Sequence, residues 1–402
     1  MASLSPAAFA YPPVRFVDPS LVMFHYEMEL LAALQAYIPD LVLLGTPVLR
    51  DPSYPLPATR PPIQGIALRR FADERGRIAG RSVQGYEYIL NRFYSLMAVA
   101  RCRPRPLVHI QFFSPFGRSV WDRPWFGWLR RFSVRLVYTV HNVLPHDREH
   151  DPAMVAHYRR LYHQVDHLIV HSEYQRVLLR ERFGVADAHM TVIPHGPLFH
   201  RLTLPPRPDA ARRLGLDGPG PYVLHFGHMR PYKGTELLLE AMAGVVQRHP
   251  QAVLLLAGPA TPERSRALQA CIGRYALDGH VHTHFGYLPT ATLAAYFALA
   301  DVVVMPYLQI DQSGVLLSAL GLGLPVIASD SGGVSETIRS QDLGYLTPVG
   351  DAEALTATIL AVLASLDEAR ARARRAQAYV CTELGWSRIA AATAALYRRL
   401  LS

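Results

Sequence analysis

Short apolar runs rich in β-branched residues alternate with helical patterns along nearly the whole chain. VRFVD at residues 14–18 is followed by MELLAALQAYI at 28–38, and PYVLHFG at 221–227 is followed by TELLLEAMAGVVQRH at 235–249. Buried strands that alternate with amphipathic helices are typical of parallel sheets covered by helices on both faces. The pattern therefore predicts a doubly wound α/β fold.

The cycle of strands and helices runs through each half of the chain. In the first half, YQRVLLRERFG at 174–184 has apolar residues at helical spacing and ends in a glycine suited to a helix C-cap. The expected strands are residues 14–18, 41–45, 107–113, 135–142, 167–172, 190–196, 221–227, 252–258, 281–286, 301–306 and 325–329. The expected helices of the second half are residues 235–249, 262–276, 289–300 and 315–323.

The length of 402 residues is too great for one ordinary hydrophobic core, so two domains are expected. A stretch rich in proline and arginine at residues 201–221 separates the two cycles and suggests a linker. We predict a Rossmann-like domain over residues 1–205, a second over 206–384, a cleft between them, and a terminal helix over 385–402.

The formal charge of +9 and the isoelectric point near 9.6 indicate an anionic partner. Nucleic acid, a phosphorylated small molecule and a membrane surface all fit the charge. Most of the positive charge is arginine scattered through the chain, whereas nucleic-acid binders more often carry a continuous basic block. We therefore expect no nucleic-acid partner.

The three cysteines, Cys102, Cys271 and Cys381, are far apart and odd in number, which fits neither a disulfide framework nor a zinc site. A reducing compartment is expected. The first residues show no signal peptide, and the longest apolar region is broken by glycines and Pro325. We predict a cytoplasmic protein, soluble or peripheral at the inner face of the cell membrane.

The segment HFGHMRPYKG, residues 225–234, places two cations at the turn between a strand and a helix. Gly227 begins the turn at the carboxyl end of the strand, where ligands bind in open α/β sheets, and the helix start favours anions. Arg230 and Lys233 add a planar fork and a mobile point charge, a pair that suits a diphosphate. The alternative is that both cations are solvated turn residues.

A second turn of small residues follows the strand at 301–306. The residues Gln312, Ser313, Gly314 and Val315 open the next helix and offer backbone amides to an anion. Beyond the following strand, Glu336 can accept hydrogen bonds from ribose or sugar hydroxyls. The alternative for Glu336 is an acidic residue in the first turn of a helix that begins near residue 334.

The succession FGHMRPYKG, ADVVVMPY, QSG, GLPVIASDSGGVSE and GYLTPVGDAEAL resembles the donor-binding domain of family 4 retaining glycosyltransferases of the GT-B fold. This resemblance covers most of residues 221–365. In the first half, LVYTVHNVLPHD and VIPHGP are similar to the acceptor-binding domain of the same family. The segment WSRIAAATAALYRRLL resembles its terminal helix, which crosses back to the first domain.

The resemblance implies a role for each matching residue. Arg230 and Lys233 would neutralise the diphosphate of the donor, and the amides of Ser313 to Val315 would bind it. Glu336 would lie near the ribose or the sugar. His141, at the end of a strand, matches a histidine close to the donor sugar and the acceptor, and His195 is a second candidate. Each histidine could instead be structural.

Two departures from the family pattern stand out. Many members carry glutamates eight residues apart around the phosphate turn, and those positions are Ile310 and Ser318 here, with Asp311 displaced by one. The loop before the first helix usually has a glycine pair, and here it reads DPSLVMFHYE at residues 18–27. Both departures leave the details of the site open.

The activity implied is transfer of a sugar from a UDP- or GDP-sugar to a glycan or lipid-linked acceptor, as in exopolysaccharide synthesis, with no prosthetic group and no metal. Because no carboxylate can be assigned as nucleophile, we expect a front-side displacement stabilised by preorganised charge. The alternatives are a catalytically silent nucleotide-sugar-binding or regulatory protein, and another GT-B activity such as a phosphorylase or an epimerase.

The region FSPFGRSVWDRPWFGWLRRFSVR, residues 113–135, mixes aromatic and basic side chains. It contains Trp121, Trp125, Phe126 and Trp128, together with Arg118, Arg123, Arg130 and Arg131. Such a surface suits docking at an anionic membrane that carries a lipid-linked acceptor. The alternative is a helix that packs on the sheet through its aromatic residues and leaves its arginines solvated.

Overall fold

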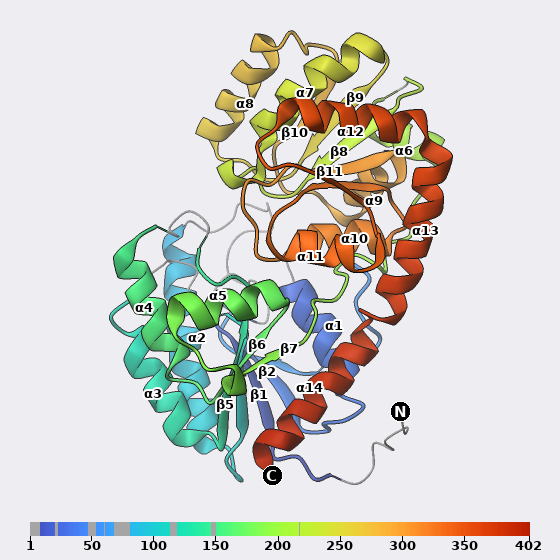
Figure 1. Cartoon of the computed structure of the whole chain (residues 1–402). Helices are drawn as coiled ribbons and strands as arrows, with labels where there is room; N and C mark the ends of the chain where they lie inside the picture. The colour runs from blue at the N-terminus through green and yellow to red at the C-terminus, as the bar shows by residue number, and fades with distance from the viewer. Residues whose placement is uncertain are drawn as a thin grey trace. The chain divides into compact units, whose positions relative to one another are not determined.

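The structure is a computed structural model of the chain, and it forms two compact units (Figure 1). Unit 1 comprises residues 1–50, 56–194 and 386–402, and unit 2 comprises residues 51–55 and 195–385. The residues described are 9–20, 23–46, 54–59, 61–67, 81–112, 119–145, 150–216 and 218–402, and the side chains of 81–84 are not described.

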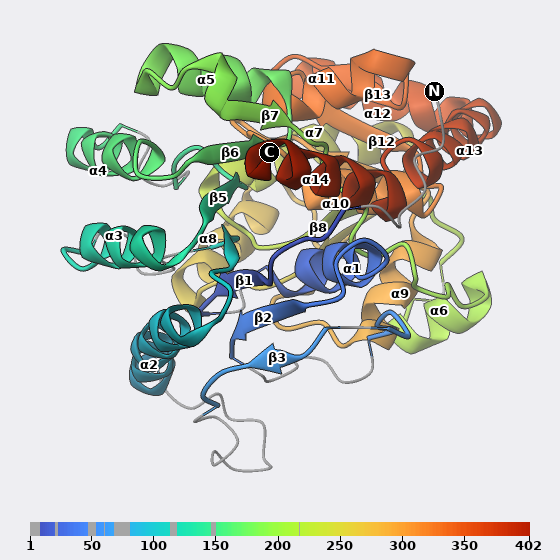
Figure 2. The same ribbon diagram turned by 90° about the horizontal axis from the view of Figure 1, so that it is seen from below.

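Unit 1 is built on a parallel sheet of seven strands in the order β3-β2-β1-β4-β5-β6-β7. Parallel strands need crossover connections, and helices supply them. Figure 2 shows α2, α3, α4 and α5 along one face of this sheet and α1 and α14 along the other. The strands are β1 (Val14–Asp18), β2 (Leu41–Gly45), β3 (Ile63–Gln64), β4 (Leu107–Ile110), β5 (Arg135–Val140), β6 (His167–Val170) and β7 (Met190–Val192).

The helices of unit 1 begin and end where local chemistry favours it. Asp151 accepts from the amide of Ala153 at 2.9 Å at the start of α4, and Ser172 accepts from the amide of Gln175 at 3.2 Å at the start of α5. Gly184 ends α5 with φ +70°, so the predicted glycine cap is confirmed. The helices are α1 (Phe24–Leu34), α2 (Arg81–Arg101), α3 (Asp122–Phe132), α4 (Pro152–Tyr162), α5 (Glu173–Phe183) and α14 (Trp386–Leu401).

Unit 2 has a parallel sheet of six strands in the order β10-β9-β8-β11-β12-β13. Its main core joins buried side chains of β8, β9, β11 and β12 to those of α7, α8 and α12. The strands are β8 (Tyr222–Phe226), β9 (Val253–Ala257), β10 (Val281–His284), β11 (Val302–Met305), β12 (Val326–Ser329) and β13 (Tyr345–Thr347). The helices are α6 (Arg207–Leu214), α7 (Thr235–Arg248), α8 (Pro262–Arg274), α9 (Thr290–Leu299), α10 (Gly314–Gly321), α11 (Gly332–Gln341), α12 (Ala352–Ala364) and α13 (Leu366–Thr382).

The doubly wound α/β class predicted from the sequence is confirmed in both units. The chain passes from unit 1 to unit 2 after Pro194, eleven residues before the end predicted for the first domain. Packing explains the position, because Leu198 lies against the start of α10 and the Phe199 ring is centred 6.0 Å from that of Phe226. The stretch predicted as a linker also contains a helix, α6, which packs on α9.

The terminal helix α14 is part of unit 1. The hydroxyl of Tyr11 donates to the carbonyl of Ala394 at 3.0 Å, and Arg399 donates to the hydroxyl of Thr191 at 2.8 Å. These bonds attach the middle of the helix to the segment before β1 and its last turn to β7. Among the helices that the structure describes, none combines the length and the apolar character needed to span a bilayer.

Candidate functional site

The cationic turn follows strand β8 directly. Gly227 has φ +114°, a conformation that residues with a β-carbon rarely adopt, and its amide donates to the carbonyl of Ala257 at 2.9 Å. A β-carbon added to Gly227 would lie 2.9 Å from Nζ of Lys233. Gly258, at φ +143°, packs so closely that its β-carbon would collide with the carbonyl oxygen of Gly227. Two glycines therefore leave the space that the lysine occupies.

Lys233 is held in a buried slot at the end of a short 3₁₀ turn, Pro231–Lys233. Its Nζ donates to the hydroxyl of Tyr307 at 3.2 Å and lies 4.8 Å from the centre of that ring. Gly234 follows with φ +65°, and a side chain there would collide with the carbonyl oxygen of Pro306. The backbone thus brings the end of β8 against the end of β11 and fixes the ammonium group between them.

Arg230 is exposed at the start of the same turn, and neighbouring contacts fix its backbone. The amide of Met229 donates to the carbonyl of Pro259 at 2.9 Å, and Nε of Arg264 donates to the carbonyl of Met229 at 3.1 Å. Arg264 in turn pairs with Glu236 at the start of α7. The turn is therefore rigidly placed, while the guanidinium of Arg230 extends from it.

His225 lies buried near the lysine and carries no charge at neutral pH. Its Nδ1 donates to the carbonyl of Val304 at 2.9 Å, and its Nε2 lies 3.2 Å from the hydroxyl of Thr235. Burial, together with the charge of Lys233, lowers the pKa of His225 to about 4. The ammonium of Lys233 therefore has no cationic histidine beside it, and its charge is available to an anion.

The turn before α10 meets the lysine turn. The hydroxyl of Ser313 caps the helix by accepting from the amide of Leu316 at 3.2 Å, and the amide oxygen of Gln312 accepts from the amide of Ser313 at 2.8 Å. A methyl carbon of Val315 lies 3.6 Å from the point where a β-carbon on Gly227 would sit. The structure therefore brings Gly227, Lys233 and the start of α10 to one place.

The remaining predicted residues of unit 2 lie around this group. Glu336 is the fifth residue of α11, and the first turn of that helix is tied to the loop before α10 because the amide of Gly333 donates to the carbonyl of Asp311 at 3.1 Å. His195 is buried, with Cε1 3.5 Å from the position of a β-carbon on Gly314. His141 belongs to unit 1, so the structure gives no placement of it against these residues.

The positions that carry glutamates in many family members have other tasks here. Ile310 is a buried apolar side chain, and the Ser318 hydroxyl donates to the carbonyl of Gly314 at 2.5 Å within α10. Asp311 is buried at the loop itself. Residues 21 and 22 of the loop before α1 lie outside the described residues.

Sequence reasoning missed several residues that shape the site. The hydroxyl of Tyr307 accepts a hydrogen bond from Lys233, and His225 lies buried nearby. Gly258 lacks a side chain that would collide with the carbonyl oxygen of Gly227. One feature of the sequence could have pointed to this site: Lys233 is the only lysine in the 402 residues. A chain that otherwise uses arginine for its basic positions keeps a lysine at this turn.

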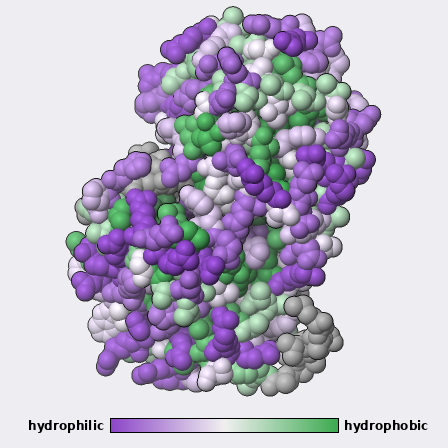
Figure 3. Space-filling model, viewed as in Figure 1, coloured by the Kyte–Doolittle hydropathy of each residue, from purple (hydrophilic) through white to green (hydrophobic). Residues whose placement is uncertain are grey.

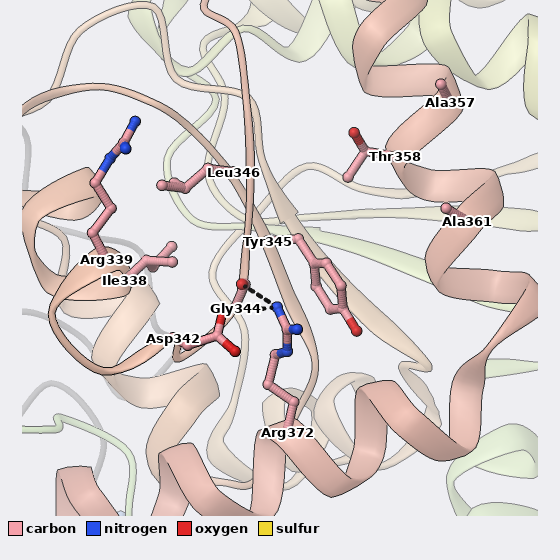
Figure 4. Close-up of a pocket in the computed structure, with 10 residues that line it drawn as sticks. All are labelled: Ile338, Arg339, Asp342, Gly344, Tyr345, Leu346, Ala357, Thr358, Ala361 and Arg372. Carbon is pink, nitrogen blue, oxygen red and sulfur yellow. Dashed lines mark hydrogen bonds and ion pairs between the residues drawn. The ribbon is translucent and has the colours of Figure 1, made fainter.

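A cavity of about 790 Å³ lies elsewhere in unit 2, beside the edge strand β13 (Figure 4). Arg372 donates to the carbonyl of Gly344 at 3.0 Å, and its guanidinium lies 4.3 Å from the centre of the Tyr345 ring. None of the residues predicted for the donor site lines this cavity. The candidate site is therefore defined by the two turns and their charges.

Within the described residues, no cluster of three or more His, Cys, Asp or Glu side chains could hold a metal ion.

Two family models match the chain. The model described as "Glycosyl transferases group 1" matches residues 220–365, which include both turns, and the model described as "Glycosyltransferase Family 4" matches residues 57–196, which include His141. Together the matches cover more than half of the chain. The chain belongs to the family 4 glycosyltransferases. The family predicted from the sequence motifs is thereby confirmed.

The names of curated relatives of this chain give different substrates. A D-inositol 3-phosphate glycosyltransferase of Geodermatophilus obscurus is 29% identical over 62% of this chain and 59% of its own length. A GDP-mannose:glycolipid 4-beta-D-mannosyltransferase of Xanthomonas campestris is 40% identical over 30% of this chain and 33% of its own length. The chain therefore matches about 60% of the length of the first relative and a third of the second.

Solved structures show that the chain has the GT-B fold. Sucrose-phosphate synthase from Thermosynechococcus elongatus has a TM-score of 0.73 at 24% identity, covering 97% of this chain and 99% of that one. HepE of Anabaena, solved in complex with UDP and glucose, has a TM-score of 0.73 at 17% identity, covering 97% and 100%. At these identities the likeness supports the fold, with its two Rossmann-like domains.

Proposed function

We propose that the protein transfers a sugar, with retention of configuration, from a nucleotide-diphosphate sugar to a glycan or lipid-linked acceptor. The observation that carries the proposal is the meeting of Lys233 and the start of α10 at Gly227. A buried ammonium group beside the first amides of a helix suits the diphosphate of such a donor. Relatives and structural neighbours agree with the proposal, since they include a GDP-mannose:glycolipid mannosyltransferase and a complex with UDP and glucose.

The proposed reaction is a front-side displacement. The bond between the anomeric carbon and the β-phosphate oxygen breaks, the acceptor oxygen bonds to that carbon from the same face, and the leaving diphosphate takes the acceptor's proton. Lys233 and Arg230 neutralise the charge that develops on the leaving group, and the amides of Gly314 and Val315 donate to it. Loss of one such donor typically costs about 3–4 kcal/mol of barrier.

The turn before α10 must adjust when the donor binds. The amide of Ser313 is already bonded to the side-chain oxygen of Gln312. A phosphate oxygen that uses this amide therefore displaces the Gln312 side chain, whose amide group then turns toward the phosphate. Glu336 of α11 accepts from hydroxyls of the ribose or the sugar, and His141 contributes from unit 1.

A panel of nucleotide sugars tests the proposal. The matching UDP- or GDP-sugar should raise the thermal transition, and the protein should release nucleoside diphosphate from it with an acceptor present. The residues at positions 310 and 318 are not acidic, which is the reason to test for a catalytically silent binder. Such a protein would show the thermal shift without release of nucleoside diphosphate. If no nucleotide sugar or nucleoside diphosphate shifts the transition, the proposal is wrong.

We also propose that the acceptor is lipid-linked and that unit 1 docks on an anionic membrane at the cytoplasmic face. Of the four aromatic residues singled out at and in α3, Trp125 and Phe126 are buried, whereas Trp121, at the N-cap, and Trp128 are 72% and 54% exposed. Two of the four therefore pack inward, and the other two lie at the surface, where a membrane could be contacted. Arg123, Arg130 and Arg131 are exposed on the same helix, whereas Arg118 lies outside the described residues.

The neighbouring helix α2 supports docking with an apolar face that sequence analysis did not single out. Tyr86, Ile89 and Phe93 are between 58% and 68% exposed, and Leu90 and Met97 are each 40% exposed. Their spacing places them on one side of the helix. On the face of the molecule in Figure 3, by contrast, apolar side chains reach the surface only in small patches among polar ones. An apolar helix face beside exposed arginines suits an anionic lipid surface.

Cosedimentation with vesicles tests the docking surface. Wild-type protein should bind vesicles that contain an anionic lipid at low salt and should dissociate as salt is added. The double variant Trp121→Ser/Trp128→Ser should bind at least about tenfold more weakly, since each exposed ring contributes buried apolar area. Tyr287→Ser, a change at an exposed aromatic residue of unit 2, is the matched control. Equal binding by all three proteins would contradict the docking surface.

A further inference from the structure

Three neighbouring strands of unit 1 each end in a polar side chain, and the three side chains form one row. Gln111 follows β4, His141 follows β5 and His171 follows β6. Nε2 of His141 lies 3.0 Å from the amide oxygen of Gln111, and Nδ1 of His141 lies 3.2 Å from Nε2 of His171. All three are buried. Both nitrogens of His141 are therefore committed to neighbours whose own bonds can be followed outward.

His171 has only one arrangement of its proton that satisfies its partners. Its Nδ1 lies 3.0 Å from the backbone carbonyl of Ile193, which can only accept, so Nδ1 carries a proton. Burial lowers the pKa of His171 to about 4, so the ring is neutral near pH 7 and its Nε2 is bare. A bare nitrogen 3.2 Å from Nδ1 of His141 requires that this Nδ1 donates.

A neutral His141 carries only one ring proton, so its Nε2 must then accept. Turning the Gln111 amide by half a turn exchanges its oxygen and nitrogen, so that the nitrogen donates to Nε2 of His141. The amide oxygen then faces Nε2 of His109, the ring nitrogen that lies 3.1 Å from the other end of the amide. His109 must donate there, and the hydroxyl oxygen of Thr139, 2.7 Å from the same nitrogen, also accepts.

The row ends on the terminal helix. Burial lowers the pKa of His109 to about 3, so this ring is neutral and its Nδ1 must accept if its Nε2 donates. The hydroxyl of Tyr397 on α14 lies 2.5 Å from that Nδ1, and burial raises the pKa of Tyr397, so the hydroxyl keeps its proton. From Tyr397 to Ile193, each hydrogen bond of the row then has its donor on the Tyr397 side and its acceptor on the Ile193 side.

We propose that His171 is a positioning residue, which holds the proton of His141 on Nδ1 and so presents Nε2 as an acceptor for a sugar hydroxyl. The inference rests on the proposed function, because it gives His141 its task in transfer. In the absence of substrate, the Gln111 amide occupies the place of that hydroxyl. Two further contacts hold His141 in place: the Tyr26 ring meets its ring edge to face with centroids 4.7 Å apart, and Gln175 donates to its backbone carbonyl at 3.3 Å.

Nitrogen NMR of protein labelled with ¹⁵N-histidine tests the proton position without any substrate. The His141 signals are assigned from their loss in His141→Gln. In wild-type protein near pH 7, His141 should show a protonated Nδ1 and a bare Nε2, and in His171→Leu the proton should move to Nε2. His167→Leu is the matched control, since His167 is a buried histidine at the opposite end of the same strand, β6, and should leave His141 unchanged.

Kinetics test the task of His141. His171→Leu should lower kcat at least about tenfold with KM for the donor within twofold, because donor binding depends on unit 2 and proton placement acts on transfer. His171→Gln, whose side-chain oxygen can still accept from Nδ1 of His141, should keep kcat within about threefold. His167→Leu should behave as wild type.

The outcomes separate the inference from the proposed function. A wild-type His141 with its proton on Nε2, or no change of tautomer in His171→Leu, would overturn the inference whatever the activity. A moved proton with kcat within twofold would overturn the role in transfer. If the wild-type protein transferred no sugar, the proposed function would fail, and the NMR result alone would decide whether His171 sets the proton of His141.

Discussion

At the scale of single residues, the chain contains one lysine, and that lysine lies at the proposed diphosphate site. An ammonium group is compact, whereas a guanidinium is a planar fork that needs more room. The slot of Lys233 is narrow, with the Gly227 backbone on one side and the Tyr307 hydroxyl 3.2 Å from Nζ. Size explains why this position does not carry an arginine like the other basic positions.

Replacement of Lys233 by arginine should therefore fail even though the charge is kept. Lys233→Arg should lose at least about a hundredfold in kcat/KM, approaching the loss of one preorganised donor. Steady-state release of nucleoside diphosphate measures the effect. The control is the converse change Arg248→Lys, at an exposed position of α7, which should leave kcat/KM unchanged. Activity of Lys233→Arg within threefold of wild type would show that the slot is not tight.

Gly227 should tolerate no side chain. Gly227→Ala places a β-carbon 2.9 Å from Nζ of Lys233 and in a strained backbone conformation, so affinity for the nucleoside diphosphate should fall at least about tenfold. Titration calorimetry with the diphosphate measures it. Gly279→Ala carries similar backbone strain at φ +85° with open space around the new carbon, so it should lose stability but keep affinity. Equal affinities would remove Gly227 from the site.

Glu27 of α1 should make the stability of unit 1 depend on pH. Both of its carboxylate oxygens are buried without a hydrogen-bond partner among the described residues, and burial, then the charge of Asp18, raises its pKa well above 4.5. A raised folded pKa gives a stabilising contribution that is present below pH 4.5 and is lost as the pH rises. Wild-type protein therefore loses stability relative to Glu27→Gln by up to about 1.4 kcal/mol for each pH unit above 4.5.

Unfolding in guanidinium at several pH values measures this difference. Tryptophan fluorescence reports on unit 1, because all four tryptophans of the chain, at 121, 125, 128 and 386, belong to it. Glu181→Gln, an exposed position on α5, is the control and should follow wild type at each pH. A Glu27→Gln curve parallel to that of wild type would contradict a neutral, buried Glu27.

At the scale of elements, the start of α10 matters more than its apolar interior. Ser313→Ala removes the cap on this helix and should cost about 1 kcal/mol of stability, with weaker binding of nucleoside diphosphate because the first amides lose their fixed direction. Ser331→Ala is the matched change at α11, where the serine makes no capping bond, and it should cost less than about 0.5 kcal/mol. Denaturation followed by circular dichroism compares the two. Equal costs would contradict the role of the Ser313 cap.

Most elements could be predicted from the sequence, and the exceptions have a physical reason. Strands such as β9 and β11 are fully apolar runs because helices cover both faces of the sheet. The edge strands β3 and β13 have only two and three residues, too few for a pattern, and neither was predicted. Helix α6 was missed because its prolines and arginines resemble a linker.

At the scale of the whole molecule, the sequence predicted the two turns of unit 2 from one rule, that ligands bind at the carboxyl ends of parallel strands. Gly227 and Val315 are far apart in the chain and lie together in the structure. Sequence could not place Tyr307 under the lysine, nor connect Tyr397 on the last helix to His109, because these contacts depend on packing between distant segments. The direction of the hydrogen bonds around His141 likewise depends on side chains at the ends of three different strands.

The central claim, that the turn at residues 227–234 binds and stabilises a departing diphosphate, is tested most directly by transfer rates of Lys233→Ala and Arg230→Ala with the matching donor. The account predicts that each variant folds, as judged by circular dichroism, and loses at least about a hundredfold in the rate of nucleoside diphosphate release. Near wild-type release by both folded variants would contradict it.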